Sequence, residues 1–358
     1  MLESQITKIV FGDEILPVWK NQNAIVFETS SVFIPYLDVA LKSILSMAKD
    51  DNYYDIIVLT REVEYIDRKM LKANVSKYKN ISLRFYDPSI IVEKYFKRNK
   101  NNYLEINYYR LALPWILKNY KSAVNLGADI VVRKDVVELL KTEFLDDEYM
   151  AGALDLGYIG RLNMNDIPLK ELGLMNPITY VNADVLVFSL ENIRNNFSID
   201  DVMCLWEKYK FRCAEQDALN LMFQKHIKKL DLRWNVYPQR MTSTEHILQS
   251  GSENVNLWRK ALQNPYIIHF AALPKPWDYP MVGYGDVWWM YARKSVYYEE
   301  IVRRMAMVAV ESKNRFDIKN RIVNKLLPLH SHRRKIVKSI VKPILLYLSI
   351  KKSYGKCK

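Results

Sequence analysis

The chain has 358 residues, of which 49% are hydrophobic and 26% are charged, values typical of a globular protein with a substantial core. Its 10 glycines are too few for a collagen-like chain or a glycine-rich linker, and three cysteines at no metal-ligand spacing favour a reducing compartment over a disulfide framework. The net charge is +13, but segment 318–358 holds twelve Lys or Arg and no acid, so the remaining body is nearly neutral.

Short apolar runs alternate with helical patterns along the first half of the chain. In chain order they predict strand 24–29, helix 35–48, strand 54–60, helix 66–75, strand 81–86, helix 103–118 and a strand that starts at 124–126. Such an alternation predicts a mainly parallel sheet that is covered by helices on both faces. The sequence therefore indicates an α/β fold.

The second half, 151–277, mixes a strand at 184–188 with helices at 202–209 and 215–224. No Pro- or Gly-rich linker separates the halves, so one continuous α/β domain is expected. The first thirteen residues have no long apolar run, and no stretch reaches the roughly 18 apolar residues of a membrane span. We therefore expect neither a secretory signal nor a transmembrane helix.

The basic tail, 318–358, has an amphipathic pattern. Its apolar face comprises Ile336, Val337, Ile340, Val341, Ile344 and Leu345, and its opposite face Lys335, Lys338 and Lys342. Pro343 is expected to kink or split this helix. Binding to an anionic membrane is favoured over a solvated tail or a nucleic-acid arm, because the last leaves the apolar face without a role. We therefore expect a cytoplasmic protein that is peripheral on the inner face of the cell membrane, with no nucleic acid partner.

Three segments carry polar residues suited to chemistry, although neither a G-x-G-x-x-G nor a Walker A motif is present. Asp129 lies between two apolar runs, where a carboxylate can bind a divalent cation or simply cap a turn. Asn182 precedes an apolar run, where it can bind a sugar hydroxyl or form a turn. His269 ends a strand and is followed by Lys275 and Trp277, a combination of metal ligand and phosphate-binding cation that is rarer than an isolated structural His.

Taken in order, these segments resemble glycosyltransferase family 8 over roughly 23–277. The first strand and helix are matched by 25–27, 35–36 and 41–44. The family's Y-R-L, Y-L-D-A-D, F-N-A-G, D-Q-D-x-L-N and H-Y-x-G-x-x-K-P-W motifs are matched by 109–111, 125–129, 180–184, 215–220 and 269–277, and 233–236 resembles the strand before the last motif.

The resemblance implies a retaining glycosyltransferase of the GT-A type, which moves galactose or glucose from a UDP-sugar to a cell-surface glycan or a lipid-linked oligosaccharide acceptor. It divides the chain into an N-terminal extension at 1–22, a catalytic domain at 23–280, a helical segment at 281–317 and the basic tail at 318–358.

The resemblance also implies roles for individual residues. The catalytic candidates are Gln216 and Asp155, which line the transferred sugar, and Asp217, which holds the loop or the donor sugar. The donor-binding candidates are Thr29, Ser30, Arg110, Asp129, Asn182 and Lys275. The ligands implied for Mn²⁺ (or Mg²⁺) are Asp129 and His269.

The sequence departs from the family pattern in four segments. Gly127 replaces the first Asp of D-x-D, which predicts weakened metal binding, and Asp184 replaces the Gly of N-A-G. Ser30, Ser31 and Val32 replace a D-D-N triplet that recognises the nucleotide, and Ala272 replaces a loop Gly near the diphosphate. The alternative to an active enzyme is therefore a non-catalytic binding module of a glycan assembly complex.

Overall fold

The computed structural model describes residues 14–98, 104–164, 173–174, 177–209, 211–239 and 241–311. The chain divides into two units, Met1–Tyr298 and Glu299–Lys358. In the second unit the described part, 299–311, is helical, and the basic tail predicted at 318–358 lies outside the described residues. No helix in the described part of the chain combines the length and the hydropathy that a membrane crossing requires.

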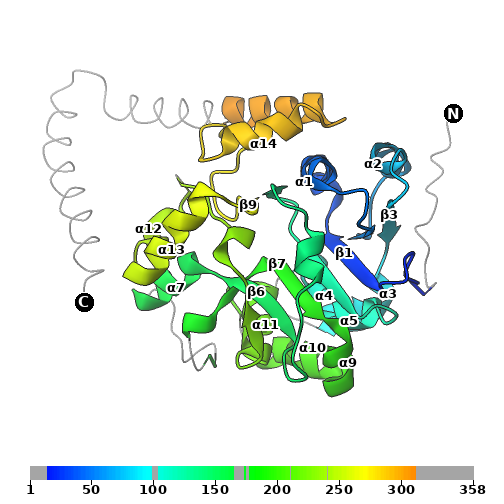
Figure 1. Ribbon diagram of the computed structural model, residues 1–358, viewed down its shortest axis with the longest axis vertical. Helices are drawn as coiled ribbons and strands as arrows, with labels where there is room; N and C mark the ends of the chain where they lie inside the picture. Colours follow the sequence, from blue (N-terminus) through cyan, green and yellow to red (C-terminus); the bar gives the residue numbers. More distant parts are fainter. Residues whose placement is uncertain are drawn as a thin grey trace, which may run out of the picture. The chain divides into compact units, whose positions relative to one another are not determined.

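A mixed seven-stranded sheet forms the centre of the first unit (Figure 1). Its strand order is β3 (Ile81–Tyr86), β2 (Tyr54–Leu59), β1 (Asn23–Glu28), β4 (Ser122–Leu126), β7 (Val181–Ser189), β6 (Met150–Leu154) and β8 (Ile227–Lys229). The first four strands are mutually parallel, whereas β7 is antiparallel to both of its neighbours. A small second sheet pairs β5 (Ile130–Val132) with β9 (Ile267–His269). This arrangement confirms the predicted α/β fold of the GT-A type, a mainly parallel mixed sheet with flanking helices.

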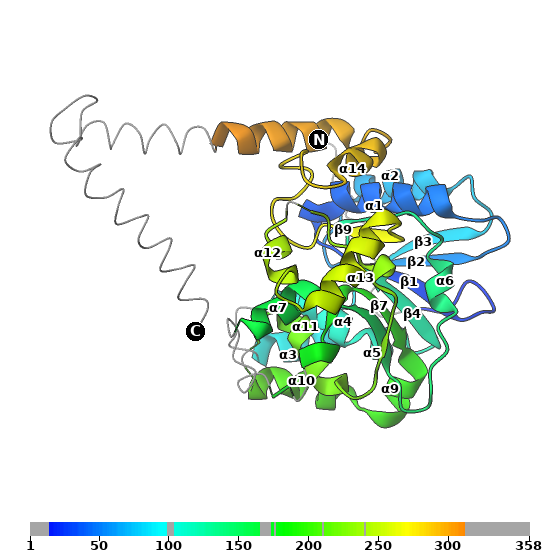
Figure 2. The same ribbon diagram turned by 60° about the vertical axis from the view of Figure 1, so that its left-hand side comes forward.

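Helices cover both faces of the sheet. They are η1 (Ser31–Phe33), α1 (Ile34–Met47), α2 (Tyr65–Val75), α3 (Ser89–Arg98), α4 (Glu105–Leu111), α5 (Leu113–Ile116), α6 (Val137–Leu140), α7 (Leu156–Asn163), η2 (Pro177–Thr179), α9 (Leu190–Asn196), α10 (Ile199–Lys208), α11 (Ala214–Phe223), η3 (Leu232–Trp234), α12 (Ser243–Ile247), α13 (Ser252–Gln263) and α14 (Gly285–Ala292). In Figures 1 and 2, α1 and α2 lie on one side of the strands and α4, α5, α9, α10 and α11 on the other.

The apolar runs of the sequence are continuous because alternate residues of one strand enter two different cores. In β1, Ala24 and Val26 pack with α3 to α5 and α9 to α11, whereas Ile25 and Phe27 pack with α1, α2, β5 and α6. A sheet that is buried on both faces has no polar face, so its strands lack the alternation of a half-buried sheet.

Two elements differ from the sequence prediction. The helix predicted at 103–118 is divided into α4 and α5 around Ala112, because Pro114 has no amide hydrogen and restricts the residue before it. The strand predicted at 184–188 begins earlier, at Val181, so Asn182 lies inside β7 and not before it.

Polar side chains gather at one edge of the sheet because of the strand directions. The parallel strands β1 and β4 end at this edge, with Glu28 on β1, and β6 ends there directly before Asp155. Since β7 is antiparallel to them, it begins at the same edge, with Asn182 and Asp184 in its first residues. Ligands of open α/β sheets bind at the carboxyl ends of the strands.

Candidate active site

The small β5–β9 sheet brings Asp129 and His269 together. Ile130 of β5 is directly opposite His269 of β9, and Asp129 immediately precedes Ile130. The backbone N–H of Phe270 donates to the carbonyl of Asp129 at 2.9 Å. As a result, Nε2 of His269 lies 3.4 Å from Oδ1 of Asp129.

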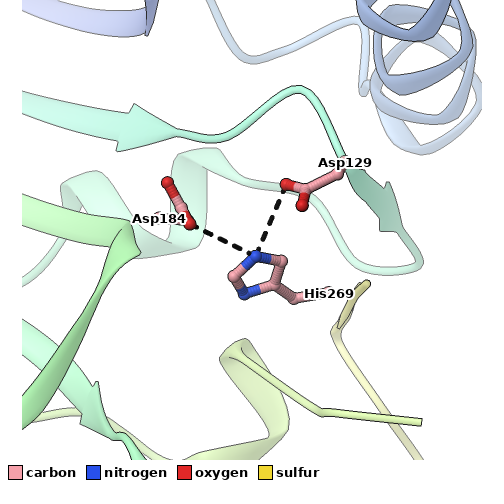
Figure 3. Close-up of side chains that lie close together, drawn as sticks. All are labelled: Asp129, Asp184 and His269. Carbon is pink, nitrogen blue, oxygen red and sulfur yellow. Dashed lines mark ion pairs between the residues drawn. The ribbon is translucent and has the colours of Figure 1, made fainter. Parts of the chain in front are cut away.

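A second carboxylate faces the same imidazole. Oδ2 of Asp184 lies 3.4 Å from Nε2 of His269, and one ligand atom each from Asp129, Asp184 and His269 all lie within 4.8 Å of one another (Figure 3). The family resemblance implied Asp129 and His269 as metal ligands, whereas Asp184 was noted only as the residue that replaces the Gly of the N-A-G motif. The one signal for Asp184 was an acid at a position where the resembled motif has no side chain.

The protonation of His269 follows from a chain of hydrogen bonds that begins at a backbone donor. The N–H of Asp184 donates to Oδ1 of Asn182 at 2.9 Å, so this Asn182 atom is an acceptor. Asn235 must therefore donate its Nδ2 to Oδ1 of Asn182, at 2.9 Å. Oδ1 of Asn235 then faces Nδ1 of His269 at 2.7 Å. Nδ1 carries a proton, and Nε2 is the nitrogen that faces the carboxylates.

The side chain of His269 is fully buried, and its Nε2 has no hydrogen-bond partner among the described residues. Burial opposes a charged ring, yet the carboxylates of Asp129 and Asp184 raise the pKa of His269 to about 9. Without that proton, Nε2 presents a lone pair beside two carboxylates. Carboxylate oxygens and an imidazole nitrogen suit a divalent cation such as Mn²⁺, so the residues present fit one.

Lys275 joins the group that Asp129 and His269 form. Its Nζ lies 2.6 Å from Oδ2 of Asp129 and 2.5 Å from the carbonyl oxygen of Phe270. Burial works against the ionisation of Asp129, but Lys275 and His269 hold its pKa well below the usual range. The two cationic groups therefore keep this carboxylate available at neutral pH.

A cavity of about 330 Å³ adjoins this group. Asp184 belongs both to the group around His269 and to the cavity wall, whereas Asp129, His269 and Lys275 do not line the cavity. Other side chains in the wall include Arg110, Asp155, Asn182, Glu215 and Gln216. The volume lies at the lower end of the range of small-molecule sites.

The predicted residues Gln216, Asp155 and Asn182 form one hydrogen-bonded unit in the cavity wall. Nε2 of Gln216 donates to Oδ2 of Asp155 at 3.1 Å, and Oε1 of Gln216 accepts from Nδ2 of Asn182 at 3.0 Å and from the N–H of Ala183 at 2.9 Å. Asp155 in turn caps α7 by accepting from the N–H of Tyr158. The amide of Gln216 therefore has one fixed orientation.

Asp217 does not line the cavity. It is 1% exposed, and its carboxylate accepts from the hydroxyls of Tyr158 and Tyr180 at 2.7 and 2.6 Å. It also accepts from the backbone N–H groups of Arg212 and Cys213 at 2.9 and 2.8 Å. Two of these four hydrogen bonds tie Asp217 to the loop before α11, which is the loop-holding place considered for it from the sequence, and the other two tie it to Tyr158 of α7 and to Tyr180 before β7.

Arg110 lines the cavity but is held by three carboxylates. Its guanidinium lies 3.2 Å from Glu28, 3.1 Å from Asp184 and 3.0 Å from Glu215. Burial raises the pKa of Glu215 to about 7, although Arg110 opposes this shift. The guanidinium that was expected to contact the donor therefore organises a buried charge cluster in this structure.

Replacing Glu215 with Gln is expected to change stability in a pH-dependent way. The pKa of Glu215 is about 7 in the folded chain against an ordinary value of 4.5, so folding favours the protonated acid. The stability that this acid contributes is present below pH 4.5 and is lost as the pH rises to 7. The amide of Glu215→Gln stays neutral at every pH. The free energy of unfolding of the variant should therefore exceed that of the parent by an amount that grows from roughly 1 kcal/mol at pH 5 to roughly 3 kcal/mol at pH 8. Urea unfolding of the parent and the variant at pH 5 and pH 8 measures the two differences in free energy, and differences of equal size would contradict the prediction.

Thr29 and Ser30 line a different cavity of about 290 Å³, together with Thr60, Arg61 and Tyr109 among others. Because Tyr109 lines this cavity and Arg110 the larger one, α4 borders both. Of the predicted donor residues, Thr29 and Ser30 therefore line the smaller cavity and Arg110 and Asn182 the larger one, whereas Asp129 and Lys275 line neither. Thr29 and Ser30 are not brought into contact with the group around His269.

The chain is similar in sequence to known glycosyltransferases. The sequence profile of glycosyl transferase family 8 matches residues 24–280. General stress protein A of Bacillus subtilis (strain 168) is 24% identical over 181 residues, which are 48% of this chain and 58% of that protein. Lipopolysaccharide 1,2-glucosyltransferase of Escherichia coli is 24% identical over 247 residues, 67% of this chain and 68% of that protein.

Two solved structures share the fold. The bifunctional glycosyltransferase WbbM has a TM-score of 0.76 at 23% identity, over 82% of this chain and 53% of that chain. The galactosyltransferase LgtC, solved with donor and acceptor sugar analogues, has a TM-score of 0.61 at 23% identity, over 76% of this chain and 96% of that chain. The chain thus spans only about half of WbbM and under two thirds of the Bacillus relative.

Proposed function

Because the chain belongs to glycosyltransferase family 8, we propose that it is a retaining enzyme that moves a hexose from a UDP-sugar to a glycan acceptor. The observation that carries this proposal is the convergence of Asp129, Asp184, His269 and Lys275 beside the cavity that holds Gln216. Galactose or glucose is the expected sugar, since similar proteins include a galactosyltransferase and a lipopolysaccharide glucosyltransferase. The acceptor would be a cell-surface glycan or a lipid-linked oligosaccharide.

The charged group suits the departure of a nucleoside diphosphate. Asp129, Asp184 and His269 would hold a divalent cation, which supplies positive charge against the diphosphate when it is bound. The ammonium of Lys275, now 2.6 Å from Asp129, would exchange its partner for a phosphate oxygen. Both effects stabilise the charge that develops as the sugar–phosphate bond breaks.

The cavity wall suits a retaining transfer. Gln216 offers a neutral amide that is fixed by Asp155, Asn182 and the N–H of Ala183. An amide is a poor nucleophile, so we favour attack by the acceptor hydroxyl on the face from which the diphosphate leaves. Gln216 and Asp155 would then orient the sugar and stabilise its positive charge, and would form no covalent bond to it.

Turnover of UDP-glucose and UDP-galactose, with Mn²⁺ and with a chelator, tests this proposal. We expect release of UDP that requires the metal and increases when a glycan acceptor is present. Donor binding without turnover would support the alternative of a non-catalytic binding module, which Gly127 favours. A chain that neither binds nor cleaves any UDP-sugar would overturn the proposal.

We also propose that the basic tail holds the protein at the inner face of the cell membrane. Deleting 318–358 should leave the melting temperature of the remaining chain nearly unchanged and abolish co-sedimentation with vesicles of anionic lipid. The matched control is the full chain with neutral vesicles and with DNA, to which it should not bind. Continued sedimentation of the deletion variant with anionic vesicles would contradict this role.

A further inference from the structure

We propose that Asp184 of β7 supplies the carboxylate ligand that Gly127, in the connection between β4 and β5, cannot supply. The cation site is then completed by an acid from a different strand. The sequence alone predicted a site weakened by Gly127. The structure instead places three ligands, Asp129, Asp184 and His269, around one point. The inference rests on the divalent cation of the proposed function.

The first argument is that the side chain of Asp184 occupies the space next to the Cα atom of Gly127. The N–H of Gly127 donates to the carbonyl of Asp184 at 2.9 Å, so the two backbones are in direct contact. A Cβ atom on residue 127 would lie 3.1 Å from Cβ and 3.2 Å from Cγ of Asp184, and 2.9 Å from Oδ1 of Asp129. The space that a side chain at 127 would enter is therefore the space that Asp184 fills.

The second argument is the orientation of the Asp184 carboxylate. Its Oδ1 lies 3.1 Å from the guanidinium of Arg110, and its Oδ2 lies 3.4 Å from Nε2 of His269. Arg110 therefore holds one oxygen and leaves the other directed toward Asp129 and His269, as Figure 3 shows for the three residues that it labels. Arg110 acts as a positioning residue for this carboxylate.

The third argument is that a buried ligand atom already faces this point. Nε2 of His269 has no hydrogen-bond partner among the described residues, and Nδ1 is occupied by Asn235. The side chain of Asp184 is 33% exposed and that of Asp129 is 15% exposed, so a cation can reach them from solvent. Two reachable carboxylates and one unpartnered imidazole nitrogen form a ligand set, whereas acidic residues alone would not.

Binding of Mn²⁺ alone to the full chain, followed by electron paramagnetic resonance of the free ion, tests the inference. Asp184→Asn and Asp184→Gly should each weaken Mn²⁺ binding by at least about tenfold, since even indirect partners of metal ligands are worth 10–100-fold. Gly127→Asp alone should not improve binding, because its side chain meets Asp184. The double variant Gly127→Asp/Asp184→Gly should restore binding to within about threefold of the parent, by returning the acid to position 127.

The matched control is Glu215→Gln, which removes another carboxylate from Arg110 without facing His269 and should change Mn²⁺ binding less than twofold. Melting temperatures show whether each variant is folded. The inference is overturned if folded Asp184→Asn binds Mn²⁺ as the parent does, or if the double variant binds no better than Asp184→Gly. Because the Mn²⁺ binding experiment uses no sugar nucleotide, it can reject the role of Asp184 while the proposed glycosyl transfer is confirmed. Equally, UDP-sugar turnover can be absent while the role of Asp184 in cation binding is confirmed.

Discussion

Replacing Asp129 with alanine is expected to lower UDP-sugar turnover by about a thousandfold or more, which is the largest effect on activity that we predict. The Asp129 carboxylate lies 3.4 Å from His269 and 2.6 Å from Lys275, so its loss removes a cation ligand and the partner that positions the ammonium. Initial rates of UDP release at saturating donor and Mn²⁺ measure the effect.

A suitable control is Asp278→Ala, which removes an exposed carboxylate that interacts with the charge of Lys275 but does not belong to the group of ligand atoms around His269. It should cost less than about twofold in rate, since exposed charges interact weakly. Rates of folded Asp129→Ala that equal those of the parent would refute the role of this acid. A loss of equal size in both variants would instead indicate a general effect of charge around Lys275.

The part of the fold that the sequence predicted is the part with strong local patterns. The strands β1 to β3 and the helices between them follow from short apolar runs and from Pro35 in the first turn of α1. The division of α4 from α5 was missed because the apolar pattern continues through Pro114, and only the backbone shows where the helix ends. Pattern arguments identify elements more readily than their ends.

For the site, residues at the ends of strands could be predicted and residues defined by strand pairing could not. Asp129, His269 and Lys275 stand in recognisable segments, and the β5–β9 register explains why they meet. Asp184 appeared to be a substitution because nothing in the linear sequence shows that it faces Gly127. Asn235, which fixes the proton on His269, gave no signal beyond its place in the matched segment 233–236. The strand expected for that segment is wrong, because η3 covers Leu232–Trp234 and Asn235 follows it directly.

The partners of Arg110 could not be predicted from the sequence either. The resemblance assigned it to the donor through its place in the Y-R-L motif. Its partners in the structure are Glu28, Asp184 and Glu215, which come from three separate elements of the chain. Pairings such as those of Arg110 with Glu28 and Glu215, which lie 82 and 105 positions away in the sequence, are set by the tertiary fold, and local sequence does not reveal them.

Replacing Arg110 with alanine is therefore expected to lower stability more than any other change considered for this cluster. Removing the guanidinium leaves three carboxylates without their shared partner, and breaking a buried ion pair costs about 3–5 kcal/mol. The melting temperature at pH 8 should fall by roughly 10 °C. Lysine should not restore it fully, because an ammonium cannot hold several carboxylates with the planar geometry of a guanidinium.

The pH dependence of this loss distinguishes the two roles of Arg110. Burial raises the pKa of Glu28 and brings that of Glu215 to about 7, so Glu215 is largely neutral at pH 5 and needs no cation there. The penalty of Arg110→Ala should then be clearly smaller at pH 5 than at pH 8. Arg161→Ala is the matched control, since Arg161 lines the same cavity and has no ion pair with another described residue. Its melting temperature should stay close to that of the parent. An Arg110→Ala variant that melts like the parent at both pH values, but has a raised KM for the donor, would return Arg110 to direct donor binding.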